Sequence, residues 1–153
     1  MSLIDVFDRS IISYHLGLSC KAKDAVRVLK SALAKRKLTK DMDDLPTIRT
    51  DNGPQFVSNL FGDTCKQLGL KHQRIPVKTP NMNAHIESFH SILEEDCYSM
   101  NEFNSYLQVY EVVSKYMDYY NNRYRHGSLN DRPPAKFYES LQNKEFKPKA
   151  FIA

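Results

Sequence analysis

Two carboxylates in this sequence stand where chemistry is possible, Asp51 and Glu87, with 35 residues between them. Asp51 directly follows the run LPTIRT, which has the β-branched and apolar content of a short buried strand. The residues that follow it, NGP, build turns. We therefore expect Asp51 at the C-terminal end of a strand, where open α/β sheets bind ligands. Carboxylate oxygens are hard ligands of the kind that suits magnesium.

Both carboxylates could instead have purely structural roles. Asp and Asn side chains commonly bond nearby backbone, so Asp51 could simply form a turn. Glu87 falls early in a helix expected from about residue 83 to 98, where an acidic residue complements the helix dipole. Asn83 is a suitable N-cap residue for that helix.

The elements that must position these carboxylates follow the order β-β-α-β-α-β. A hairpin turning at residues 8–10 opens the chain, and KDAVRVLKSALAKRK has the apolar spacing of an amphipathic helix. The strand ending at Asp51 precedes a helix near 56–68 that stops at Gly69, and LKHQRIPV reads as the next strand. The opening MSL resembles an expression remnant, so we set it outside the fold.

Helices account for the rest of the chain. The helix over 83–98 carries an apolar stripe, Ile86, Phe89, Leu93 and Cys97. A second helix over 102–122 is expected to bury Phe103, Leu107, Tyr110, Val113, Met117 and Tyr120. The remainder, with one short helix from Ala135, is expected to pack on the core as a basic tail.

Composition indicates one globular domain. The chain has 153 residues, of which 41% are hydrophobic and 26% charged, and no apolar run approaches the roughly 20 residues that cross a bilayer. Three widely spaced cysteines argue against both a disulfide framework and a zinc site. We therefore expect a cytoplasmic protein, in a reducing compartment.

Charge is unevenly distributed along the chain. The net charge is +4, and basic residues concentrate in residues 21–40 and 123–136. Either segment could be an ordinary solvated face. If they meet a nucleic acid, we expect non-specific, salt-sensitive binding to DNA.

Three segments, RTDNGPQF, NAHIESFHSIL and YNNRYRHGSLNDRPPAKFY, resemble the catalytic domain of bacterial insertion-sequence transposases. This is the integrase-core (DDE-type) family, similar to retroviral integrases. The family uses two aspartates and a glutamate, the second Asp and the Glu lying 35 residues apart. The resemblance implies a ribonuclease H-like mixed α/β sheet flanked by helices. We assign residues 4–122 to the catalytic core, 123–153 to the basic tail and 1–3 to the remnant.

The resemblance also implies roles for particular residues. Asp51 and Glu87 would be the catalytic metal ligands of Mg²⁺ or Mn²⁺, in an enzyme that nicks transposon ends and joins them to target DNA. Two cations in such a site activate the attacking hydroxyl and stabilise the leaving oxygen. The DNA contacts implied are Gln55, Lys78, Asn83, Arg123, Arg125 and His126. We expect a homo-oligomer with no membrane role, associated with the nucleoid.

The match has departures. The family's first Asp lies in a Trp-x-x-Asp segment on the central strand, which is absent here, and Asp5 matches the neighbouring strand instead. We therefore expect a chain truncated at its N-terminus, inactive alone, whose missing strand is replaced by another chain or a rearranged hairpin. Glu94 replaces a family Lys or Arg, which weakens the case for DNA contact by its helix. His85 and His90 are expected to be surface or packing residues.

Two other functions stay open. A non-catalytic nucleic-acid-binding or dimerisation module derived from a transposase would explain the absent Asp and the acidic Glu94. A ribonuclease H-like nuclease shares the metal site but not the YNNRYRHGSLNDRPPAKFY segment. End recognition by a helix-turn-helix region would have to lie elsewhere.

Overall fold

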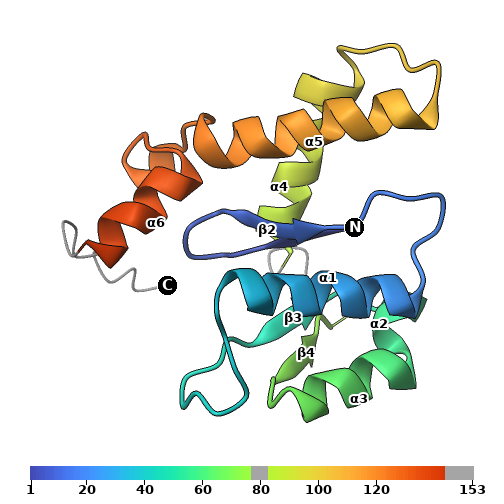
Figure 1. The fold of residues 1–153 in the computed structure, drawn as a ribbon, viewed down its shortest axis with the longest axis vertical. Coiled ribbons are helices and arrows are strands. Elements are labelled where there is room, and N and C mark those ends of the chain that lie inside the picture. Colours follow the sequence, from blue (N-terminus) through green and yellow to red (C-terminus); the bar gives the residue numbers. More distant parts are fainter. Residues whose placement is uncertain (77–82, 144–153) are drawn as a thin grey trace. The chain divides into compact units, whose positions relative to one another are not determined.

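A computed structural model describes residues 1–76 and 83–143 of the chain (Figure 1). The chain divides into two compact units, and each is described by itself. The first unit comprises Met1–Ile4 and Ile12–Ile92. The second comprises Asp5–Ile11 and the chain from Leu93 on. The predicted domain ranges do not follow this division, and they stay a prediction.

The described strands form two separate pairs. Strand β1 (Ser2–Ile4) pairs with β2 (Ile11–Tyr14), and β3 (Ile48–Thr50) pairs with β4 (His72–Arg74). The second pair is parallel, with Ile48 opposite His72 and Thr50 opposite Arg74. β1 and β3 therefore each have a strand partner on one side among the described residues. The fold class is mixed α/β, as predicted, and the described strands form two small sheets.

The first three residues take part in the fold of the first unit, and their assignment as a remnant stays a prediction. The amino group of Met1 donates to the carbonyl of His15 at 3.0 Å, and the His15 N–H donates back to the Met1 carbonyl at 2.8 Å. Leu3 and Met1 also pack against the hydrophobic core of the first unit. Backbone pairing and apolar burial act together here, which composition alone did not indicate.

Helix α1 (Ala22–Lys35) lies over that core, as its apolar spacing predicted. The core cluster contains Ala25, Leu29, Leu33, Phe61, Cys65 and Leu70, and side chains of β1 and β3 pack against it. The helix therefore holds both strand pairs of the first unit through one set of apolar contacts.

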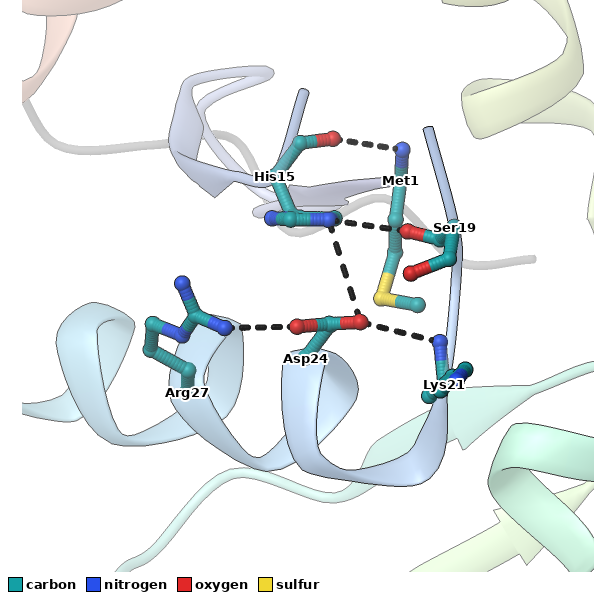
Figure 2. A network of polar contacts seen from close by, with 6 residues as sticks. All are labelled: Met1, His15, Ser19, Lys21, Asp24 and Arg27. Atoms are coloured by element: carbon teal, nitrogen blue, oxygen red, sulfur yellow. Dashed lines mark hydrogen bonds and ion pairs between the residues drawn. The ribbon is translucent and has the colours of Figure 1, made fainter. Parts of the chain in front are cut away.

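A polar network fixes the start of α1 (Figure 2). The Asp24 carboxylate accepts the Lys21 N–H at 3.0 Å and the Arg27 guanidinium at 2.6 Å, and it lies 3.8 Å from the His15 ring. The Lys21 N–H lowers the pKa of Asp24 below its ordinary value, and His15 and Arg27 add to this. One buried carboxylate thus satisfies an orphan donor of the first turn.

One predicted helix is in fact two. α2 (Pro54–Val57) and α3 (Asn59–Gln67) are separated at Ser58, whose backbone is extended. The Ser58 hydroxyl accepts the Phe61 N–H at 3.3 Å and so caps α3. Gly69 follows with a φ of +71°, and this left-handed residue ends α3 where the sequence predicted.

Helix α4 (Ala84–Leu93) leads into a π-helical turn over Glu94–Tyr98. Phe89, Leu93 and Cys97 are buried, which confirms most of the predicted stripe. The Ser99 N–H donates to the Glu94 carbonyl at 2.8 Å, the five-residue spacing of a π turn. The acidic residues Glu94, Glu95 and Asp96 are exposed, as expected of a solvated face.

The second unit contains α5 (Tyr106–Asn122), a 3₁₀ turn (Gly127–Leu129) and α6 (Pro134–Gln142). α5 begins at Tyr106, directly after its cap Ser105 and four residues later than predicted. Val113, Met117 and Tyr120 are buried as predicted, but Leu107 and Tyr110 are 65% and 49% exposed. α6 and the π turn pack on α5. Helical spacing identified the apolar stripe correctly but not how far it is covered.

Candidate active site

Asp51 follows β3 directly, as predicted, and its side chain is exposed. Its Oδ1 accepts the Gly53 N–H at 2.8 Å, so one oxygen forms the turn. The Asn52 side-chain amide donates to the Ile75 carbonyl at 2.8 Å, just beyond β4. Two strand ends are therefore tied together under Asp51, and its carboxylate is held in place while exposed to solvent.

Backbone and side-chain bonds also fix the residue before Asp51. The Thr50 hydroxyl lies 2.9 Å from His72 Nε2 and donates to the Asp51 carbonyl at 3.0 Å. Burial lowers the pKa of His72, and the nearby Arg74 adds to this. A neutral His72 ring therefore supports the end of β3 from beneath.

Gln55 is the second predicted site residue that the structure brings to this turn. A Cβ built on Gly53 would lie 2.5 Å from Gln55 Nε2 and 3.0 Å from Asp51 Oδ1. The amide of Gln55 and the carboxylate of Asp51 therefore both lie close to the α-carbon of Gly53. The absence of a side chain at Gly53 is what permits this approach.

Glu87 lies in the first turn of α4 and is exposed. Its N–H donates to the Asn83 carbonyl at 3.1 Å, and the Ile86 N–H donates to the same oxygen at 3.1 Å. Asn83 thus stands at the start of α4, where the cap was predicted. Asp51 and Glu87 both belong to the first unit.

The metal-ligand role stays a prediction. In residues 1–76 and 83–143, no group of three or more His, Cys, Asp or Glu side chains is arranged to hold a metal ion. Two exposed carboxylates supply hard oxygen donors that fit Mg²⁺ or Mn²⁺, but they are fewer than a dedicated site uses.

The predicted DNA contacts lie in different surroundings. Lys78 falls outside the described residues. Arg123, just after α5, and Arg125 are exposed in the second unit. His126 is half-buried, and its ring centroid lies 5.2 Å from that of Tyr120 and 5.0 Å from that of Tyr124.

The ring of His126 packs against aromatic side chains. Its Nε2 is buried and has no hydrogen-bond partner within the described part of the chain. Burial lowers the pKa of His126, and the nearby Arg9 guanidinium adds to this. Burial also raises the pKa of Tyr120 to about 12. A neutral histidine enclosed by tyrosines serves to shape the loop that carries Arg125.

Two asparagines with structural roles were missed from the sequence. Asn52 has just been described, and Asn121 brackets the backbone of Ile11, accepting its N–H at 2.9 Å and donating to its carbonyl at 3.0 Å. Asn121 therefore imitates a neighbouring strand at that residue. Its 110-residue separation from Ile11 left no local signal in the sequence.

No helix in the described ranges is long and apolar enough to cross a bilayer.

Comparison with known proteins places these features in a family. Profiles of the integrase core domain match residues 1–80 and 68–134. An uncharacterized 39.2 kDa protein of insertion element IS476 from Xanthomonas euvesicatoria is 28% identical over 145 residues, which cover 95% of this chain and 40% of that protein. The putative transposase InsK of IS150 from Escherichia coli is 24% identical over 79% of this chain and 41% of its own length.

Solved structures agree in fold. A chain of the simian T-cell lymphotropic virus intasome, in complex with the PP2A regulatory subunit B56 gamma, superposes with a TM-score of 0.75 at 21% identity. The match covers 98% of this chain and 51% of that chain. The chain thus spans about half the length of the relatives it matches, with the fold of a retroviral integrase. On the two profile matches, it belongs to the integrase core domain family.

Proposed function

We propose that this chain is the catalytic core of a DNA transposase, a DDE-type polynucleotidyl transferase that carries out metal-dependent phosphoryl transfer. The observation that carries the proposal is the exposed carboxylate of Asp51, which a parallel strand pair and two side-chain bonds hold at the end of β3. A rigid support under an exposed ligand residue is what a metal-dependent site requires.

Asp51 and Glu87 would hold Mg²⁺ or Mn²⁺ in this proposal. The bound cation supplies Lewis-acid stabilisation of charge on phosphate oxygens. Two carboxylates about 4 Å apart repel by roughly 4 kcal/mol at an effective dielectric of 20, so bringing them together is favourable only with a cation between them. The Gln55 amide, beside Asp51 over Gly53, would orient the carboxylate or a DNA oxygen by hydrogen bonding.

The substrates in this proposal are transposon ends and target DNA. Arg123 and Arg125 expose guanidinium groups that can pair with phosphates. Lys78 and Asn83 stay proposed contacts by resemblance, and His126 would act by positioning Arg125. A homo-oligomer would also cover the open sides of β1 and β3, because unpaired strand edges favour association.

Two carboxylates alone should hold a cation weakly, so we expect negligible strand transfer by this polypeptide by itself. A non-catalytic DNA-binding or dimerisation module is the second candidate. It is favoured by the lack of any three-ligand metal cluster in the part of the chain that the structure describes. The gene sequence upstream of Ile4 distinguishes the two candidate functions. A Trp-x-x-Asp segment encoded there supports the enzyme, and its absence supports the non-catalytic module.

Manganese titration followed by electron paramagnetic resonance tests the metal role directly. We expect weak binding that falls at least about tenfold in Asp51→Asn and in Glu87→Gln, as expected when a hard oxygen ligand is lost. Asp63→Asn and Glu111→Gln are matched controls, because both residues are exposed and neither is assigned to the site. Equal losses in the controls and the site variants would refute the assignment of these two ligands.

A further inference from the structure

The exposed face of α1 is basic and shares no residue with the candidate active site. Lys23, Arg27 and Lys30 are spaced i, i+4 and i+7, which places them on one side of the helix, and all three are exposed. The opposite side of α1 is buried in the core of the first unit. These three residues, with Lys40, are called the α1 basic stripe below.

Acidic side chains do not cancel this charge. Asp24 is the one acid on α1, and its carboxylate is buried against Lys21, His15 and Arg27 (Figure 2). Among the stripe residues it forms an ion pair with Arg27, and the nearby charge of Lys23 also acts on it. No hydrogen bond or ion pair to the Lys23, Lys30 or Lys40 side chain is seen within residues 1–76 and 83–143. Lys35 differs, since its ammonium group donates to the Ile12 carbonyl at 2.9 Å.

A hollow continues the stripe past the end of α1. It has a volume of about 240 Å³, and Lys30 and Lys40 line it together with Leu33, Leu38 and Leu45. Its lining therefore combines two cationic side chains with apolar ones. The sugar-phosphate backbone of DNA has matching character, because anionic phosphates alternate along it with the weakly polar faces of deoxyribose.

We propose that the α1 basic stripe binds the phosphate backbone of duplex DNA without reading its sequence. The choice of DNA as partner rests on the proposed transposase function, but the stripe contains neither Asp51 nor Glu87. Lys23 and Lys30 are about 10 Å apart along the helix axis, a length over which duplex DNA carries about six charges. Exposed Asp41, Asp43 and Asp44 follow Lys40 and would repel phosphates, so they mark one end of the surface.

Fluorescence anisotropy with a labelled 30-base-pair duplex of random sequence tests the proposal on the full chain. The stripe variant is Lys23→Gln/Lys30→Gln/Lys40→Gln. The control is Lys66→Gln/Lys71→Gln/Lys115→Gln, which removes the same charge from other exposed positions. Circular dichroism and a melting curve establish that both variants fold.

We expect the stripe variant to bind about tenfold more weakly at 50 mM salt. Its slope of log affinity against log salt should fall by about 2 to 3 units, and the control should change by less than about twofold in affinity. Equal weakening in both variants would overturn the proposal, because net charge would then explain binding. Equal affinity for poly-glutamate would overturn DNA as the partner.

The test of the stripe does not depend on whether Asp51 and Glu87 bind a metal ion. Glu111→Gln removes an exposed acid that belongs neither to the stripe nor to the candidate site, so it should leave duplex affinity within about twofold. If Asp51→Asn leaves manganese affinity unchanged while the stripe variant still loses duplex affinity, the proposed catalytic function is refuted and the proposal for the stripe is supported. If Asp51→Asn lowers manganese affinity while the stripe variant keeps its duplex affinity, the proposal for the stripe is refuted and the proposed catalytic function is supported.

Discussion

Two aspartates of the first unit each accept a backbone N–H from a residue close in sequence, but their surroundings differ. Asp24, in the first turn of α1, is buried and accepts bonds from Lys21 and Arg27. Asp51, in the turn after β3, is exposed and gives one oxygen to the Gly53 N–H. A carboxylate saturated by its own chain stabilises the fold, whereas one with a spare oxygen is available to a ligand. The four predictions below test this contrast by melting temperature and metal affinity.

Asp24→Asn should have the largest effect on stability. It removes a charged capping group from α1, and we expect a fall of about 5 °C in melting temperature at pH 7 with no change in manganese affinity. Because the folded pKa of Asp24 is lowered, its contribution is present above the ordinary aspartate value of about 4 and is lost as pH falls through the folded pKa. The difference between variant and parent should therefore shrink below about pH 4. A difference that grows in acid would contradict the assignment.

Asn52→Ala should have an intermediate effect. It removes the bond from the Asn52 amide to the Ile75 carbonyl and leaves that acceptor to water. One such bond contributes about 1 kcal/mol, which corresponds to about 3 °C for a chain of this size. Manganese affinity should fall as well, by about threefold, because Asp51 loses its support. Unchanged metal binding would show that the support is dispensable.

Gly53→Ala should change the site more than the fold. The backbone φ of Gly53 is −58°, so alanine adopts it without strain, but the added methyl would displace the Gln55 amide. We expect the melting temperature to stay within about 2 °C and manganese affinity to fall about threefold.

Gly62→Ala is the matched control for that prediction. A Cβ at Gly62 meets nothing within 4 Å, and the residue lies in α3. Alanine there should raise stability by about 1 kcal/mol through helix propensity and leave metal binding alone. A loss of metal affinity in both glycine variants would mean that the effect at Gly53 is not local.

Asp51→Asn should have the smallest effect on stability. Asparagine preserves the acceptor for the Gly53 N–H, so the melting temperature should stay within about 1 °C. A fall as large as that of Asp24→Asn would erase the distinction between the two aspartates.

Local patterns predicted most of the fold. Apolar spacing identified α1, and Gly69 fixed the end of α3 because a left-handed residue is required there. The split at Ser58 was missed, since its short side chain serves as a cap as readily as it fits within a helix. Exposure of Leu107 and Tyr110 depends on which element lies opposite them, and periodicity carries no such information.

The candidate site was predicted in part. The strand-end position of Asp51 and the helical position of Glu87 follow from neighbouring residues, and the structure has both. The approach of Gln55 to Asp51 over Gly53 depends on side-chain conformations that no spacing rule provides. His126 lies beside Tyr120 and Tyr124, which are close in sequence, but the Arg9 guanidinium that also acts on it comes from the hairpin turn, which is distant in sequence.

The tip of the first hairpin has a practical consequence for dissecting this protein. Residues 5–11 are grouped with the second unit, where Asn121 brackets Ile11 and the Phe7 ring lies 5.8 Å from that of Phe137. The polypeptide therefore passes between the units three times, and no single cleavage point separates them. A fragment ending at Ile92 would keep residues 5–11 but lose the second-unit side chains that contact them. If such a fragment failed to fold, the reason would be this loss, and the result would not show that the first unit is unstable by itself.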